Sequence, residues 1–127
     1  MAKRKKVLIV DDDETMRALT ALQMEGLGFT ADVFDSAPKA LEAYEENDYD
    51  LIFMDIQMPG MDGLEATRSI RQREQETNRK RTAIIALTAS REKDSAIQAG
   101  MDDFLFKPVL LGALRQVVSN WNEQMGS

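Results

Sequence analysis

The strongest constraint on the fold of this chain is an alternation of short apolar runs with segments of helical periodicity. Each run has the length of a strand, and the second is the weakest. The runs are Val7–Val10, Thr30–Phe34, Leu51–Met54, Ala83–Leu87 and Phe104–Phe106. Runs of this kind are typical of strands that are covered on both faces.

Between these runs, apolar residues recur at every third or fourth position, which predicts helices with one buried stripe. The stripes are Met16–Leu19–Leu22, Ala37–Leu41–Tyr44, Leu64–Thr67–Ile70 and Leu110–Leu114–Val117–Trp121. We expect Gly26, Gly28 and Gly100 to end helices as left-handed C-cap residues. The highly charged stretch from Arg71 to Thr82 is interpreted as a solvated loop.

Strand followed by helix, repeated five times, predicts an α/β fold with a parallel sheet between helices, because crossovers between parallel strands are right-handed. At 127 residues the chain has the length of one domain. We therefore expect a single domain over residues 1–127 with a core from about 5 to 122. The tail 123–127 could include a cloning remnant at Gly126 and Ser127.

Composition narrows the possible functions. Twenty-two acidic residues against sixteen basic ones give a net charge of −6, which argues against direct binding of nucleic acid. No apolar stretch has the length of a membrane span, so we expect a cytoplasmic protein. The chain has no histidine, which excludes a Ser-His-Asp triad and the usual zinc sites. Its chemistry must rely on carboxylates, hydroxyls and lysines.

Polar residues follow four of the five predicted strands, at the edge where parallel sheets form their ligand sites. They are Asp11, Asp12 and Asp13 after the first strand, Asp55 after the third, Thr88 after the fourth and Lys107 after the fifth. Several have a structural alternative. Asp11 and Glu14 have the spacing of a capping box, Thr88 or Ser90 can cap a helix, and Asp55 can brace the loop after it.

The carboxylates require a positive partner, because each close pair would repel by about 4 kcal/mol at an effective dielectric constant near 20. Lys107 supplies one charge, and a divalent cation would supply the rest. Mg²⁺ suits a site with one or two carboxylates and a phosphate oxygen. We therefore predict a magnesium site at Asp11 and Asp12, with Asp55 as a nucleophile toward phosphorus and with Thr88 and Lys107 binding the phosphoryl oxygens.

Four segments resemble the response-regulator receiver domain of two-component signalling, in order along nearly the whole chain. They read VLIVDDDETMR, LIFMDIQMPGMDGLEATRSIR, IIALTAS and AGMDDFLFKPV. The amino-acid sequence of these segments most resembles that of receivers from hybrid sensor histidine kinases. The resemblance implies a flavodoxin-like (βα)5 three-layer sandwich with strand order 2-1-3-4-5, and a cis bond between Lys107 and Pro108.

The resemblance also implies roles for individual residues. Asp55 would be the phosphoacceptor, assisted by Thr88 and Lys107. The implied Mg²⁺ ligands are Asp11, Asp12, Asp55 and the backbone carbonyl of Gln57. Thr88 and Phe104 would form the switch that responds to phosphorylation, and the side chains of Gln57 and Ser90 would tune dephosphorylation.

A receiver is a phosphorylation-activated switch that catalyses its own phosphoryl transfer from a phosphohistidine donor and its own dephosphorylation. The implied partners are a histidine kinase or a histidine phosphotransfer domain, and a downstream protein that binds the face made by the fourth helix, the fifth strand and the fifth helix. The segment from Thr88 to Gly100 is about three residues shorter than in the usual receiver, close to one helical turn.

One alternative uses the same residues differently. The stretch from Asp11 to Thr15 fits the DxDxT signature of haloacid-dehalogenase-type phosphatases, in which Asp11 would be the nucleophile. That interpretation leaves Asp55 unexplained and finds no acidic pair after Lys107. A flavin-binding module of the same fold class would need a glycine- and hydroxyl-rich loop where Asp11, Asp12 and Asp13 stand.

Overall fold

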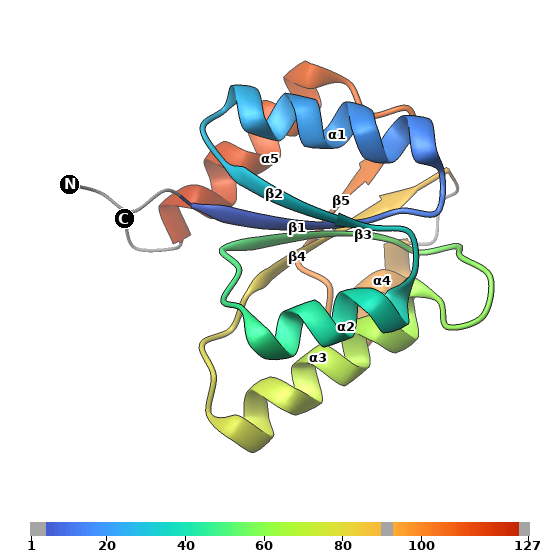
Figure 1. The fold of residues 1–127 in the computed structure, drawn as a ribbon, viewed down its shortest axis with the longest axis vertical. Coiled ribbons are helices and arrows are strands. Elements are labelled where there is room, and N and C mark those ends of the chain that lie inside the picture. Colours follow the sequence, from blue (N-terminus) through green and yellow to red (C-terminus); the bar gives the residue numbers. More distant parts are fainter. Residues whose placement is uncertain (1–4, 90–92, 125–127) are drawn as a thin grey trace.

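The computed structural model describes residues 5–89 and 93–124, which form a three-layer sandwich of helices, sheet and helices (Figure 1). Strand and helix alternate five times, as predicted. The elements are β1 (Lys6–Val10), α1 (Glu14–Gly26), β2 (Thr30–Phe34), α2 (Ala37–Glu46), β3 (Leu51–Asp55), α3 (Gly63–Thr77), β4 (Ala83–Thr88), α4 (Lys93–Ala99), β5 (Asp103–Phe106) and α5 (Leu111–Gln124).

All five strands are parallel and lie in the order β2-β1-β3-β4-β5, which confirms the predicted topology. The order reverses at β1, whose residue Ile9 pairs with Val33 on one side and with Phe53 on the other. Sites in such sheets form beside this reversal, beyond the carboxyl ends of the strands. The Lys107–Pro108 peptide bond is cis, also as predicted.

The central strands are buried on both faces because successive side chains point to opposite sides of the sheet. In β1, Leu8 and Val10 belong to the core under α2, α3 and α4, whereas Val7 and Ile9 belong to the core under α1 and α5. Figure 1 shows these two groups of helices on opposite faces. The continuous apolar runs in the sequence are explained by this double covering.

The side of helix α1 that faces the core is not the side predicted from the positions of its leucines. Thr20 and Met24 are buried, while Leu19 and Leu22 are 38% and 67% exposed. The inward stripe is spaced by four residues and runs from the half-buried Met16 through Thr20. The stripe predicted from every third residue was therefore wrong for this helix, because its position over β1 and β2 decides which side is covered.

The interpretation of Arg71–Thr82 as a solvated loop was also wrong. Helix α3 continues to Thr77, and Asn78 ends it in the left-handed region with φ 56°. Two charged residues of this stretch, Arg71 and Glu74, have side chains only 12% and 7% exposed. They are paired with each other and with groups from more distant parts of the chain, which a sequence pattern does not display.

Glycine at the ends of helices matches the prediction in two of three places. Gly28 and Gly100 have φ of 95° and 107°, whereas Gly26 is still part of α1. In the part of the chain that the structure describes, α4 has seven residues and is shorter than the other helices. Within residues 5–89 and 93–124, the longest apolar helical stretch falls short of what is needed to cross a bilayer.

Candidate phosphoryl-transfer site

The carboxyl ends of β1, β3, β4 and β5 bring the predicted site residues to one edge of the sheet. Asp55 and Thr88 are the last residues of β3 and β4, and Asp11 and Lys107 directly follow β1 and β5. The side chains of Asp11 and Asp55 are 1% and 3% exposed, and that of Lys107 is 17% exposed. Residues far apart in the sequence thus form one buried polar group.

Lys107 joins the two buried acids. Its Nζ lies 2.9 Å from Oδ2 of Asp55 and 3.1 Å from Oδ1 of Asp11, and donates a hydrogen bond to each. The backbone of the lysine is anchored as well, because its N–H donates to the carbonyl of Thr88 at 2.8 Å. One ammonium therefore faces two carboxylates in a place with little water.

The pKa values of Asp55 and Lys107 reflect both their burial and the charges around them. Burial, the largest cause, together with the neighbouring Asp11, raises the pKa of Asp55 to about 7, although Lys107 opposes the rise. Burial by itself would lower the pKa of Lys107, but its bonds to Asp55 and Asp11 outweigh that effect and leave it raised. A second positive charge near Asp55 would favour its ionised, nucleophilic form.

The acidic group has the composition of a site for a hard cation. One oxygen each from Asp11, Asp12 and Asp55 lie within 4.8 Å of one another. Oδ2 of Asp11 is buried and has no hydrogen-bond partner among the described residues. A buried acceptor of this kind is costly unless something binds it. Carboxylate oxygens of this kind, one of them without a partner among the described residues, suit a hard cation such as Mg²⁺.

The acid that caps α1 is not the one that the capping-box spacing indicated. Asp13, not Asp11, is the N-cap of α1, and its side chain accepts a hydrogen bond from the N–H of Met16. Oδ1 of Asp11 accepts from the N–H of Asp13 at 2.9 Å. Asp13 thus caps the helix, which leaves Asp11 and Asp12 for the acidic group.

The loop between β3 and α3 packs closely against the backbone of Asp55. Asp62 caps α3 by accepting from the N–H of Glu65, and the N–H of Gly63 donates to the carbonyl of Ile56 at 3.0 Å. A Cβ atom at position 63 would collide with the backbone carbonyl of Asp55. The Asp62–Gly63 pair is a turn signal in the sequence, but its contact with Asp55 depends on how the loop folds back.

The predicted switch residues share one face of the sheet. Thr88 is 3% exposed and pairs across the strands with Phe106, and Ala86 pairs with Phe104. The rings of Phe104 and Phe106 contact edge to face, with centroids 5.1 Å apart and planes at 75°. Phe106, which the sequence analysis had not singled out, is 51% exposed and lies directly beside Thr88.

The two residues assigned to dephosphorylation have different outcomes. Gln57 is exposed in the loop after Asp55, and its N–H donates to Oδ1 of Asp55 at 3.2 Å. The backbone of Gln57 therefore lies at the edge of the acidic group. Ser90 lies outside the described residues.

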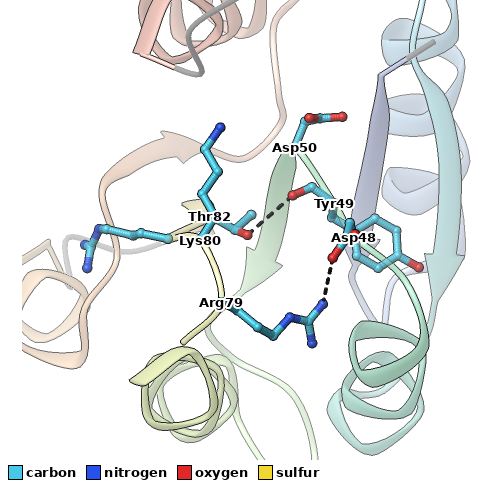
Figure 2. A pocket seen from close by; sticks show the side chains of 7 residues that line it. Asp48, Tyr49, Asp50, Arg79, Lys80 and Thr82 are labelled. Atoms are coloured by element: carbon cyan, nitrogen blue, oxygen red, sulfur yellow. Dashed lines mark hydrogen bonds and ion pairs between the residues drawn. The ribbon is translucent and has the colours of Figure 1, made fainter. Parts of the chain in front are cut away.

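A pocket of about 380 Å³ lies at the opposite edge of the sheet, before β3 and β4. It is lined by residues 48–50 and 79–82. Figure 2 shows that the basic side chains there diverge, because Arg79 turns to Asp48 while Lys80 points away from it. The pocket therefore lacks converging cations and takes no part in the acidic group at the carboxyl edge.

Comparison with known proteins points to one family. The family model described as response regulator receiver domain matches residues 7–119. The sensor protein GacS of Pseudomonas syringae pv. syringae is 41% identical over 91% of this chain, and hybrid signal transduction histidine kinase A of Dictyostelium discoideum is 37% identical over 94%. The chain spans only 13% and 6% of those two proteins.

Solved structures agree with the sequence comparison. A two-component response regulator from Clostridium difficile has a TM-score of 0.86 at 28% identity, covering 98% of this chain and 100% of that one. A chain in the co-crystal structure of the Saccharomyces cerevisiae histidine phosphotransfer protein Ypd1 with the receiver domain of Ssk1 has a TM-score of 0.84 at 30% identity. There the match covers 95% of this chain and 91% of that one.

Proposed function

The chain belongs to the response regulator receiver domain family, and we propose that Asp55 is the residue on which it accepts a phosphoryl group. The observation that carries this proposal is the burial of Asp55 beside Lys107, within reach of two more carboxylates. Burial also raises the pKa of Asp55 to about 7. A charged lysine and a cation would convert it to the nucleophilic carboxylate.

In the transfer, a carboxylate oxygen of Asp55 bonds to phosphorus while the bond from phosphorus to the donor's histidine nitrogen breaks. The nitrogen keeps the electron pair and takes up a proton. Lys107 and Thr88, at the ends of neighbouring strands, hold the phosphoryl oxygens through an ammonium and a hydroxyl. Water later attacks the phosphorus and releases inorganic phosphate, which restores the carboxylate. Catalysis of this kind consists mainly of positioning and charge stabilisation.

Receivers of this family bind Mg²⁺ at an acidic pocket, and here Asp11, Asp12 and Asp55 would hold it, with the backbone carbonyl of Gln57 as a further ligand. The bound ion supplies positive charge that offsets the carboxylates and the incoming phosphoryl oxygens. The unpartnered Oδ2 of Asp11 supports this assignment. Lys107 remains the chain's own cation at the site, hydrogen-bonded to both buried acids.

The phosphoryl donor is a protein with a phosphohistidine, either a histidine kinase or a histidine phosphotransfer domain. The 127 residues contain no histidine, so that histidine lies in another protein or another part of a longer one. The structural likeness to a receiver crystallised with a histidine phosphotransfer protein supports such a partner.

The response to phosphorylation passes through Thr88 and Phe104 to the surface made by α4, β5 and α5. Four large apolar residues stand exposed on this surface or beside it. They are Ile97 at 57%, Phe106 at 51%, Leu110 at 68% and Leu111 at 44%. Exposed large apolar side chains are often found on protein-binding surfaces. A downstream protein would read the phosphorylation state there.

The test is to incubate the protein with acetyl phosphate and Mg²⁺, reduce the acyl phosphate with borohydride, and locate the modified residue by peptide mass spectrometry. We expect modification at Asp55 and none in Asp55→Asn. Modification at Asp11 would overturn the proposal in favour of the phosphatase-like alternative. The variant Asp103→Asn is the matched control, because Asp103 lies at the start of β5 and bonds to Trp121, away from the carboxyl edge.

A further inference from the structure

We propose that Arg17 is a positioning residue for the cation site: its guanidinium fixes the peptide group that joins Asp11 to Asp12 and thereby directs the Asp12 carboxylate toward the other two acids. The inference rests on the proposed function, in which these acids hold Mg²⁺. Arg17 belongs to the second turn of α1 and is half-buried.

The contact that supports this role is a hydrogen bond from Nη1 of Arg17 to the backbone carbonyl of Asp11, 2.9 Å long. The pairing of β1 with β2 ends at the same residue, where the N–H of Asp11 donates to the carbonyl of Phe34 at 3.1 Å. The strand thus fixes the N–H of Asp11, and a side chain from α1 fixes its carbonyl.

Asp12 depends on this contact more than Asp11 does. The side chain of Asp11 has anchors of its own, since its Oδ1 accepts from the N–H of Asp13 and from Lys107. Asp12 is exposed, yet one of its carboxylate oxygens lies within 4.8 Å of oxygens from the two buried acids. Because a peptide group is planar, holding the carbonyl of Asp11 also sets the direction in which Asp12 leaves the strand.

Arginine suits this place because its fork of donors can bind a carbonyl while its charge remains near other groups. The pKa of Asp35, in the loop after β2, is lowered mainly by its hydrogen bond to Lys39 and also by the charge of Arg17. Arg17 and Lys39 are therefore two cations that act on the same carboxylate. Of the two, Arg17 bonds the carbonyl of Asp11, whereas Lys39 bonds Asp35 at 3.1 Å.

The charge and the orientation of Arg17 have opposite effects on cation binding, which makes the proposal testable by sign. Removing a positive charge beside carboxylates strengthens their attraction for Mg²⁺. Releasing the peptide group between Asp11 and Asp12 weakens binding, because a misdirected ligand must be reordered. Loss of a group that orients a metal ligand typically costs tenfold or more in affinity.

The experiment compares Arg17→Gln with Lys39→Gln in a titration of the full chain with Mg²⁺, followed by NMR at constant ionic strength. We expect Mg²⁺ to bind about tenfold more weakly to Arg17→Gln. Lys39→Gln should bind it as tightly as the wild type or slightly more tightly. An affinity in Arg17→Gln equal to or higher than that of Lys39→Gln would overturn the proposal.

Two further readouts separate positioning from general damage. Thermal unfolding in EDTA should show Arg17→Gln to be folded, and its rate of Asp55 modification by acetyl phosphate should return to the wild-type value at saturating Mg²⁺. A rate that stays low at saturation would overturn the positioning role. If Arg17→Gln does not fold, Arg17→Met, which keeps the apolar stem, replaces it with the same two outcomes.

Failure of this inference is distinguishable from failure of the proposed function. If the wild type is modified at Asp55 and binds Mg²⁺ while Arg17→Gln binds it equally well, Arg17 has no positioning role and the proposed function stands. If the wild type fails to bind Mg²⁺, the cation site and the role of Arg17 are overturned together.

Discussion

Among the described residues, two largely buried groups of charged side chains lie at opposite ends of the sheet, and they differ in how completely their charges are paired. The carboxyl-edge group consists of Asp11, Asp55 and Lys107, with two acids against one base and with the exposed Asp12 close by. The amino-edge group consists of the buried Arg71, Glu74 and Asp102, and the 59% exposed Arg81 bonds to Asp102 at its rim, so that two acids face two bases.

The amino-edge group is densely paired. Arg71 alone donates to the carboxylates of Glu74 and Asp102 and to the carbonyls of Thr82 and Gly100, at 2.6–2.9 Å for the shortest bond to each. These bonds join α3 to the segments that enter β4 and β5. Buried ions paired this completely can be tolerated with little cost, since their hydrogen bonds replace water.

The carboxyl-edge group leaves an acid in excess and a buried oxygen of Asp11 without a partner among the described residues. At the amino edge, by contrast, the second acid is compensated by Arg81, which pairs with Asp102. The difference teaches that unpaired charge, rather than buried charge as such, marks the place where a cation and a phosphoryl group would bind.

The largest effect that tests this comparison is the loss of stability expected when the amino-edge group is broken. Arg71→Met should lower the free energy of unfolding by about 3–5 kcal/mol, because it leaves Glu74 and Asp102 buried without their main partner. Denaturant unfolding measures the loss. The control is Arg73→Met on the same helix, whose side chain is 45% exposed and should cost less than about 1 kcal/mol. Equal losses in the two variants would contradict the distinction.

A somewhat smaller effect is the pH dependence of stability that the carboxyl-edge group causes. Because the pKa of Asp55 is raised from 3.8 to about 7 in the folded state, the folded protein binds more protons than the unfolded one between these values. In EDTA, the free energy of unfolding should therefore fall as the pH rises from about 4 to 7, by about 3 kcal/mol through this group.

The measurement is urea unfolding as a function of pH for the wild type and for Asp55→Asn. The variant lacks the titrating carboxyl, so the difference between the two profiles isolates Asp55. The wild type should lose stability relative to the variant as the pH rises. Parallel profiles would show that Asp55 titrates near its ordinary value in the folded state.

The smallest of the three effects is stabilisation by Mg²⁺. A ligand present at a hundred times its dissociation constant stabilises the folded state by about 2.7 kcal/mol. We expect this gain in the wild type and in Arg71→Met, since the amino-edge group is remote from the cation. Asp11→Asn should lose most of it. A thermal shift that persists in Asp11→Asn would place the cation elsewhere.

Sequence patterns were sufficient for the order and type of the elements and for the candidate residues at the carboxyl edge. Continuous apolar runs predict buried parallel strands, and polar residues that directly follow such runs must meet at one edge. Asp55, Thr88 and Lys107 were found in this way, because the end of a strand is a local property of the chain. The resemblance to receivers then supplied the strand order, which the structure confirms.

The errors concern residues whose surroundings come from elsewhere in the chain. Arg71 looked solvated in a charged stretch, yet its partner Asp102 is 31 residues away. Leu19 and Leu22 looked buried because leucine is apolar, but the placement of α1 covers Thr20 instead. Capping by Asp13 in place of Asp11 was decided by the three-dimensional path of the turn.

The sequence by itself therefore determined the alternation of strands and helices, the fold class and the chemical types of the groups delivered to the carboxyl edge, since these follow from local periodicity. Only the tertiary structure decided which charges are compensated. Pairing depends on distances between side chains that belong to different elements, and a charge interaction changes several-fold with a few ångströms and with burial. For this reason the contact of Arg17 with the carbonyl of Asp11, like the neutral group around Arg71, came into view only when the chain was folded.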